Sequence, residues 1–295
     1  MLTFKPVELS DKPIFDKFYK RTNYFLCAYC FTDIFIWKNA YKTAFAVEDG
    51  FIYLTFEDGG MTMFSAPMGE GDYRAALLRL KEYADSISQP FCIDTIPPEY
   101  KIKTEQAMPG YFDFVRERDY ADYIYSAEKL MYLKGKKLHG KRNHINKFLQ
   151  TYDNWSYEPL TDDNTKEFFD YQLDWCKDNP DDFLGETCAV SAALRNRTAL
   201  GIKGGLLRLD GRIIAVTLGS ETFPDTFTVH IEKADHTIPG AYQMINQQFA
   251  LNNFEKYTYI DREEDLGIEG LRKAKLSYFP DFIAEVYSAR PRERG

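Results

Sequence analysis

The sequence lacks the features that would place it across a membrane or in an oxidising compartment. No apolar run approaches the ~18 residues that span a bilayer, and the first residues do not follow the charged and then apolar pattern of a signal peptide. Five cysteines, an odd number, provide no disulfide framework. We therefore expect a cytoplasmic protein, either free or peripheral at a membrane surface.

The signatures of several enzyme classes are missing as well. There is no Walker-type or dinucleotide-binding glycine loop and no G-x-S-x-G segment. Neither Cys176 nor Cys188 stands in a recognisable nucleophile motif, and the four histidines are scattered over residues 139–236 without metal-ligand spacing. The lone C-x-x-C pair, Cys27 and Cys30, has no second pair beside it, so we expect two small core residues rather than a metal or redox site.

Length and charge set further bounds. The chain has 295 residues, too many for one average core, so two domains of similar size are expected. Aromatic residues are abundant, with 23 Phe and 21 Tyr. The net charge of −8 argues against indiscriminate nucleic-acid binding, although it leaves room for a local basic patch.

The first half of the chain has the pattern of a mixed α/β domain. A helix over 9–21, with Pro13 in its first turn, precedes two strand-like runs, and the Asp49-Gly50 pair between these runs is a strong hairpin signal. A strand, a helix, a strand, a short helix and an extended segment then follow, at residues 61–67, 72–86, 91–97, 97–107 and 112–126.

The second half repeats this order. A helix over 161–176, with Thr161 as its N-cap, and a helix over 186–196 precede a hairpin turned at Asp210-Gly211. The later elements are a strand, a helix that starts at Pro239, a strand, a helix and a last strand, at residues 226–234, 239–254, 257–263, within 261–280, and 282–289.

The repeated order of elements is that of the GNAT acyltransferase fold, present twice. The halves share element order rather than residue identity, so the repeat is structural. We predict an α/β fold with mixed sheets, made of two tandem GNAT-like domains over residues 1–128 and 129–295. The second domain includes a basic helix over 134–150.

That basic helix belongs to an island of positive charge. From Lys129 to Lys147 there are seven Lys or Arg residues, Arg142 among them, and no acid. Within a helix from about residue 138 to 152, Lys137, Lys141, His144 and Lys147 fall on one face. This face is either a solvated polar surface or a site for phosphates, such as those of tRNA, an anionic lipid head group or a nucleotide.

The strand at 226–234 would line the reaction cleft of a GNAT fold. Alternation along a strand places His230 and Glu232 on the same side. They are a possible general base and the residue that orients it, although ordinary polar residues on a half-exposed strand would give the same pattern.

An acidic loop and an apolar helix occupy residues 261–280. Four of the first five residues are acidic, and the following helix has an apolar arc formed by Ile268, Leu271, Ala274, Leu276, Tyr278 and Phe279. Lys275 falls near the centre of this arc and Arg272 lies inside it. A lysine on a core-facing stripe needs an anionic partner, so Lys275 is either part of a structural ion pair, a snorkelling side chain or a cation aimed into a site.

The turn after the 226–234 strand bears on the acyl donor. In coenzyme-A-dependent GNAT enzymes this turn carries glycines whose neighbouring amides hold pyrophosphate. Here it reads DHTIPGA, in which Pro239 removes an amide and only Gly240 remains. Acetyl-CoA is therefore not the expected donor.

Two segments resemble one particular family. YLKGKKLHGKRNHINKF (132–148) and GLRKAKLSYFPDFIAEVYSA (270–289) look like segments of the C-terminal catalytic domain of phosphatidylglycerol lysyltransferases. The whole chain is similar to soluble bacterial relatives of that domain, and the Fem peptidyltransferases share the tandem GNAT architecture. The resemblance implies transfer of an aminoacyl group from aminoacyl-tRNA to an acceptor. The transmembrane domain of the lysyltransferases has no counterpart in this sequence, so the acceptor stays open between a lipid and a small molecule.

The leading hypothesis is an aminoacyl-tRNA-dependent aminoacyltransferase without a further cofactor. An amine or hydroxyl acceptor would attack the aminoacyl ester directly, with Glu232, His230 or Asp265 as the base and Lys275 stabilising the oxyanion. The expected substrate-binding residues are Lys137, Lys141, Arg142, Lys147 and Arg272. The alternatives are an acyl-CoA-dependent GNAT N-acyltransferase and a tandem GNAT binding module without turnover.

Overall fold

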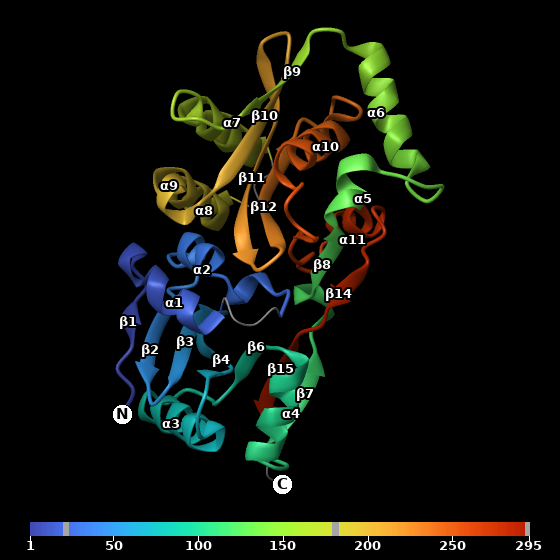
Figure 1. The fold of residues 1–295 in the computed structure, drawn as a ribbon. Helices are drawn as coiled ribbons and strands as arrows, with labels where there is room; N and C mark the ends of the chain where they lie inside the picture. Colours follow the sequence, from blue (N-terminus) through green and yellow to red (C-terminus); the bar gives the residue numbers. More distant parts are fainter. Residues whose placement is uncertain (20–23, 179–182, 293–295) are drawn as a thin grey trace. The chain divides into compact units, whose positions relative to one another are not determined.

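The computed structural model describes residues 1–19, 24–178 and 183–292. The chain divides into two compact units, which Figure 1 shows in sequence colours. Unit 1 comprises Met1–Ala121 together with the chain from Ala284, and unit 2 comprises Asp122–Ile283. The boundary expected between residues 128 and 129 thus differs from this division, because the strand that begins at Asp122 belongs to unit 2 and the last strand returns to unit 1.

Unit 1 is built on one mixed sheet. Within the described residues its strand order is β1-β2-β3-β4-β6-β15-β7, and β5 pairs with β3. The strands are β1 (Lys5–Pro6), β2 (Ala44–Glu48), β3 (Phe51–Asp58), β4 (Met61–Ser65), β5 (Met68–Gly69), β6 (Ile93–Ile96), β7 (Phe112–Arg116) and β15 (Tyr287–Pro291). The helices are α1 (Lys12–Tyr19), α2 (Phe31–Trp37), α3 (Tyr73–Ser86) and α4 (Pro98–Ala107), with 3-10 turns η1 (Leu9–Asp11), η2 (Cys27–Tyr29) and η3 (Arg118–Tyr120).

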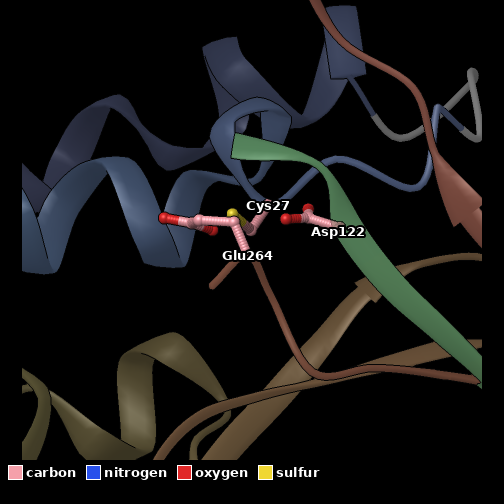
Figure 2. Close-up of side chains that lie close together, drawn as sticks. All are labelled: Cys27, Asp122 and Glu264. Atoms are coloured by element: carbon pink, nitrogen blue, oxygen red, sulfur yellow. The ribbon is translucent and has the colours of Figure 1, made fainter. Parts of the chain in front are cut away.

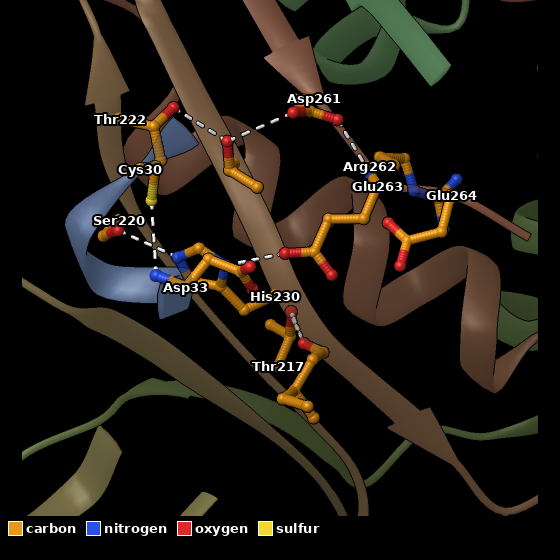
Figure 3. Close-up of polar contacts among 12 residues, drawn as sticks. Cys30, Asp33, Thr217, Ser220, Thr222, His230, Asp261, Arg262, Glu263 and Glu264 are labelled. Carbon is orange, nitrogen blue, oxygen red and sulfur yellow. Dashed lines mark hydrogen bonds and ion pairs between the residues drawn. The ribbon is translucent and has the colours of Figure 1, made fainter. Parts of the chain in front are cut away.

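Local signals in unit 1 give the predicted elements. Asp49 (φ 47°) and Gly50 (φ 82°) form the turn of the β2–β3 hairpin, as predicted, since both central residues of such a turn need positive φ. The side chain of Asp72 caps α3. Residues 20 and 21 of the predicted first helix lie outside the described residues. Cys27 and Cys30 are buried free thiols, as predicted, and Cys30 Sγ accepts the Asp33 amide in the first turn of α2 (3.3 Å; Figure 3).

Unit 2 is also built on one mixed sheet. Its strand order within the described residues is β14-β8-β13-β12-β11-β10-β9. The strands are β8 (Asp122–Ser126), β9 (Trp155–Pro159), β10 (Lys203–Leu209), β11 (Arg212–Phe223), β12 (Thr226–Ala234), β13 (Tyr259–Asp261) and β14 (Phe282–Ala284). The helices are α5 (Ala127–Tyr132), α6 (His139–Thr151), α7 (Thr165–Asp178), α8 (Phe183–Arg195), α9 (Arg197–Leu200), α10 (Ala241–Asn253) and α11 (Glu269–Leu276).

Two predicted extended segments are each divided between the sheets. Residues 112–126 form β7 in unit 1 and β8 in unit 2, and residues 282–289 contain β14 beside β8 and the start of β15 between β6 and β7. Sequence periodicity detects an extended backbone but not which sheet supplies its hydrogen bonds. The chain therefore crosses between the units twice, once in each of these segments.

Two helix starts differ from the predicted ones. Thr161 does not cap α7: the helix begins at Thr165, and the Thr161 amide donates to the Asn164 side chain (2.7 Å). Helix α10 begins at Ala241 rather than at Pro239, with Gly240 as its N-cap at φ 93°. None of the helices in the described residues is long and apolar enough to cross a membrane.

The strand pair β12–β13 positions the polar centre of unit 2. The two strands run parallel and pair from Thr226↔Tyr259 to Thr228↔Asp261. Strand β12 then continues to Ala234, while the chain after Asp261 leaves the sheet as a loop. Beyond Thr228 the β13 edge of β12 therefore faces the loop, while its other edge stays paired with β11.

Helix α6 packs against the start of α10. A Cβ atom added at Gly240 would lie 2.8 Å from the carbonyl oxygen of His144 and 3.0 Å from Cβ of Phe148. The core beneath contains large buried side chains such as Phe148, Phe227 and Phe249. A glycine is needed at this position both for its positive φ and for the close approach of α6.

We predict that Gly240→Ala lowers the free energy of unfolding by about 1–3 kcal/mol more than Gly211→Ala does, as measured by urea denaturation. Both glycines have positive φ (93° and 78°), so both substitutions strain the backbone. A Cβ at Gly211 meets nothing within 4 Å, whereas one at Gly240 collides with α6. Equal losses in the two variants would show that α6 does not pack on Gly240 in solution.

Candidate functional site

The centre of the candidate site is the loop Asp261–Asp265 that follows β13. Its backbone leaves the sheet with Glu263 in a left-handed conformation (φ 57°), and the Glu263 amide donates to Asp261 Oδ1 (2.7 Å). Asp261 is fully buried, and Thr228 Oγ1 donates to its other carboxylate oxygen (3.5 Å; Figure 3). Burial raises the pKa of Asp261 to about 7.

One lysine holds this loop. The Lys275 ammonium, on α11, donates to the backbone carbonyl oxygens of Arg262 (2.5 Å), Glu263 (3.1 Å) and Glu264. An ammonium has three N–H bonds, so these three acceptors use its whole donor capacity. Burial lowers the pKa of Lys275, and the nearby Glu264 and Glu263 carboxylates act against that shift.

The expectation that Lys275 stabilises an oxyanion is therefore not supported by its geometry. Its hydrogen bonds go to neutral carbonyl oxygens and not to a carboxylate, and no N–H bond is left for a substrate. Lys275 is 7% exposed and is the buried residue of α11. It is a positioning residue for the loop.

The apolar arc of α11 was predicted to face the core, and this prediction is wrong for most of its residues. Ile268, Leu271 and Leu276 are 36–49% exposed, and Phe279 is 41% exposed. Tyr278 is buried, as predicted. A helical wheel gives the angle of each side chain but not where the neighbouring elements end, and here the loop covers Lys275 while leaving the flanking apolar residues at the surface.

His230 is held at both ring nitrogens. Its Nδ1 lies 2.8 Å from Glu263 Oε1 and its Nε2 lies 2.9 Å from Ser220 Oγ (Figure 3). This is the order of groups in a nucleophilic Ser-His-acid triad. Ser220 is fully buried, however, and burial lowers the pKa of His230 to about 3. A sealed, weakly basic imidazole of this kind fixes Glu263 in place.

Glu232, also on β12, is held by two donors. Its Oε1 accepts Arg262 Nη2 (2.9 Å) and its Oε2 accepts Asn246 Nδ2 from α10 (2.9 Å). A carboxylate has about four lone-pair positions, so two remain after these bonds. Strict alternation along β12 would place His230 and Glu232 on one face, but a bulge between the pairs Gly219↔Val229 and Leu218↔Ile231 interrupts that alternation. Glu232 meets Asn246 of α10, whereas His230 meets Ser220 of β11. Both side chains still contact the loop, through Arg262 and Glu263 respectively.

The end of the loop is tied to α11. Arg272 donates to both oxygens of Asp265, from Nε (2.9 Å) and Nη2 (2.7 Å), and Tyr123 OH donates to Oδ2 (2.5 Å). Burial would raise the pKa of Asp265, but the hydrogen bonds from Arg272 and Tyr123 outweigh it and lower that pKa overall. Asp265 and Arg272 thus form a structural pair, which makes Asp265 a poor base and occupies Arg272.

The carboxylates of Asp122 and Glu264 also approach each other in unit 2. Their oxygens lie within 4.8 Å, Asp122 at the start of β8 and Glu264 in the loop (Figure 2). Both carry negative charge toward the Lys275 ammonium. The negative charge of these acids therefore favours the charged form of Lys275, against the effect of its burial.

The basic helix α6 divides its cations between two directions. Lys147 on α6 is exposed, as is Lys137 in the turn just before the helix, whereas Lys141 is half-buried with its Nζ 4.2 Å from the ring centroid of Tyr278. Burial and the charge of Arg262 lower the pKa of Lys141 to about 8. Arg142 Nη1 donates to the Leu133 and Gly135 carbonyl oxygens, so it closes the preceding turn.

Several residues predicted from the sequence gather at the loop 261–265. Asp265 lies in the loop, and the others contact it: His230, Glu232, Arg272 and Lys275. Lys141 approaches the same place from α6, while Lys137 and Lys147 remain outside it. The sequence reasoning missed Ser220, Asn246 and Arg262. In the β11–β12 pairing Ser220 lies opposite Thr228, two residues before His230. A bulge at Leu218/Gly219 shifts the register there, so the contact between Ser220 and His230 does not follow from regular strand pairing.

The turn before α10 does not form a row of free amides. The Ala241 amide donates to Ile238 and the Thr237 amide to Asp235 Oδ1. Helix α6 covers Gly240 from outside. A pyrophosphate at this helix start would need both the amides and the space that α6 occupies.

We predict that Lys275→Met lowers the free energy of unfolding by about 3–5 kcal/mol, because three buried carbonyl oxygens lose their donor. Lys273→Met is the matched control, since Lys273 is exposed on the same helix and its loss should change stability by less than about 0.5 kcal/mol. Chemical denaturation measures both. A Lys275→Met protein as stable as the control would mean that the ammonium does not hold the loop.

The comparisons with known proteins agree on the fold. A solved structure of a protein of unknown function from Bacteroides thetaiotaomicron is 42% identical, covers 99% of this chain and 100% of its own, and superposes with a TM-score of 0.92. The C-terminal domain of a putative lysylphosphatidylglycerol synthetase from Agrobacterium fabrum (13% identity, 96% and 91% coverage, TM-score 0.67) has the same fold. So does a tandem GNAT protein from clavulanic acid biosynthesis (10% identity, 100% of both chains, TM-score 0.51).

A relative from Mycoplasmoides gallisepticum, an uncharacterised protein, is 27% identical over 178 residues, 56% of this chain. The chain spans about half, 54%, of the length of that relative. The predicted architecture of two tandem GNAT-like domains is confirmed by the solved structures. The family model of the phosphatidylglycerol lysyltransferase C-terminal domain matches residues 19–290, and the chain belongs to this family.

Proposed function

We propose that this protein transfers an aminoacyl group from aminoacyl-tRNA to an amine or hydroxyl acceptor. The observation that carries the proposal is the family match over residues 19–290, which includes both the basic helix and the loop that holds the candidate site. The geometry supports it, because a carboxylate, Glu232, lies beside cations from the loop and from α6. The acceptor is a lipid or a small molecule.

Glu232 is the group best placed to act as the base. Its two occupied lone pairs bind donors that keep the carboxylate oriented, and two positions remain for a substrate proton. The acceptor's nucleophilic atom attacks the ester carbonyl while Glu232 takes its proton. The ester bond to the ribose oxygen then breaks, and that oxygen leaves as a hydroxyl after the proton is passed to it. No covalent enzyme intermediate is needed.

The other loop contacts keep Glu232 in position. His230 fixes the Glu263 side chain, Lys275 fixes the loop backbone, and the loop in turn presents Arg262 to Glu232. These residues act through Glu232 and do not exchange protons with the substrate. A preorganised carboxylate of this kind requires no rearrangement at the moment of reaction.

The outward face of α6 is the proposed tRNA contact. Lys137 and Lys147 are exposed, and within the described residues neither forms an ion pair. Exposed lysines at helical spacing suit phosphate oxygens, which fix position without reading sequence. The direction of Lys141 toward Glu232 leaves it outside this surface.

To test the reaction, the purified protein is incubated with a charged tRNA pool and an acceptor extract, and loss of the aminoacyl ester is followed with transfer to the acceptor. We expect Glu232→Gln to lose about 100-fold or more in rate, the usual scale for a general base, with little change in tRNA affinity. Glu269→Gln, an exposed acid at the start of α11, is the matched control and should stay within about twofold of wild type.

Failure of the protein to consume any charged tRNA would contradict the transferase. If it binds charged tRNA without turnover, the binding module becomes the better description. Micromolar binding of acetyl-CoA would instead favour an acyl-CoA-dependent GNAT N-acyltransferase. Our proposal expects acetyl-CoA affinity no better than about millimolar, since α6 covers Gly240 and the adjacent amides are used.

We also predict that Lys137→Glu with Lys147→Glu weakens tRNA binding by about tenfold or more at low salt and reduces the slope of log affinity against log salt. Lys166→Glu with Lys177→Glu, two lysines on α7 that pair with Asp170 and Asp174, gives the same change in net charge away from α6. Filter binding over a salt series measures both. The same loss in both double variants would mean that net charge, and not α6, governs binding.

A further inference from the structure

Arg262 carries a donor that the described chain does not use. Its Nη2 binds Glu232, but its Nη1 is shielded from solvent and has no hydrogen-bond partner. A buried donor without an acceptor destabilises a fold, and more so when the donor is charged. Such a guanidinium is kept in a fold when a group from outside the chain supplies the missing acceptor.

A second cation, from another element, contacts the same aromatic ring as Arg262. The Cζ atom of Arg262 lies 4.9 Å from the ring centroid of Tyr278, and Lys141 Nζ lies 4.2 Å from that centroid. Lys141 is half-buried and forms no ion pair among the described residues. The two cations therefore share one buried ring, and only Lys141 reaches toward solvent.

The charges around this ring do not balance. The ionisable groups that face Lys141 are Arg262 from the loop, Glu232 from β12 and Tyr278 after α11. Burial raises the pKa of Tyr278 far above neutral, so its hydroxyl stays uncharged. Two cations thus face one carboxylate, and that carboxylate already accepts from Arg262 and Asn246. One positive charge is left without a counter-ion.

We propose that Lys141 and Arg262 form a binding site for a compact oxyanion, a carboxylate or phosphate group carried by the acceptor substrate. An anion between them meets the unused Nη1 donor and the unpaired ammonium at once. A neutral water would satisfy the hydrogen bond but would leave the positive charge. The assignment of the anion to the acceptor rests on the proposed transferase function, whereas the anion site itself does not.

This site would place the acceptor beside its base. An anionic group held by Lys141 and Arg262 lies next to Glu232, because Arg262 touches both. The nucleophilic amine or hydroxyl of such an acceptor then needs to be only a short distance along the molecule from its anionic group. Lys141 and Arg262 would thereby select acceptors that carry a negative charge near the nucleophile.

The test is an NMR titration of the full-length protein, without tRNA, with inorganic phosphate in one series and acetate in the other, following the backbone amide signals of the loop residues 261–265. We expect saturable binding in the millimolar range at pH 7 that weakens about tenfold or more in Lys141→Met. Lys273→Met, at an exposed lysine on α11, is the matched control and should bind within about twofold of wild type. Arg262→Lys, which keeps the charge but loses the planar fork, should also weaken binding.

The pH dependence gives a second readout. Acetate stays ionised from pH 6 to 10, so only the protein titrates in that series. The ammonium of Lys141 is fully present below its pKa of about 8 and is lost above it, although a bound anion moves that pKa upward. Acetate affinity should therefore be constant below pH 8 and fall as pH rises through and beyond it.

The two anions separate the possible acceptors. Phosphate binding at least tenfold tighter than acetate assigns a phosphate-bearing acceptor, and comparable affinities assign a carboxylate-bearing one. Absence of saturable binding of either anion up to 100 mM, roughly the limit of a measurable site, would overturn the anion site. Equal weakening in Lys141→Met and Lys273→Met would overturn it too. Because no tRNA is present, either result leaves the proposed transfer reaction to be judged by its own assay.

Discussion

The candidate site depends on one buried ammonium. Three consecutive carbonyl oxygens can converge on a single point only if the backbone between them departs from an extended path, and Glu263 adopts a left-handed conformation (φ 57°) to allow this. That conformation is strained for a residue with a side chain. The hydrogen bonds from Lys275 offset the strain, so the loop and the lysine depend on each other.

The shape of the loop directs its side chains to two neighbouring elements, β12 and α11. Asp261 meets β12 and Asp265 meets α11, while Arg262 and Glu263 reach Glu232 and His230 on β12. A shift of the loop would disturb all of these contacts together, because its residues are adjacent in the chain. Among the residues predicted from the sequence as a catalytic group, His230 and Lys275 thus hold the loop, and the loop in turn contacts Glu232 through Arg262.

What could be predicted from the sequence was local. The Asp49-Gly50 and Asp210-Gly211 turns fix their hairpins through backbone preferences of two residues. Alternation along β12 is a weaker guide, because a bulge interrupts it between His230 and Glu232. The buried face of α11 could not be predicted, because its exposure depends on a loop that covers Lys275 alone. Ser220 and Arg262 were missed for the same reason: their partners follow from a strand bulge and from a left-handed residue, and neither leaves a periodic signal.

The placement of α6 connects the fold to the proposed donor. By packing on Gly240, this helix occupies the place where a coenzyme-A-dependent GNAT enzyme would hold pyrophosphate. The same helix turns Lys147 outward and Lys141 inward, and Lys137 is exposed in the turn before it. A donor whose phosphates form an extended backbone can bind the outer face and deliver only its aminoacyl end to Glu232. A donor whose pyrophosphate must sit at the start of α10 cannot, so the position of α6 supports a tRNA-linked acyl group over a coenzyme-linked one.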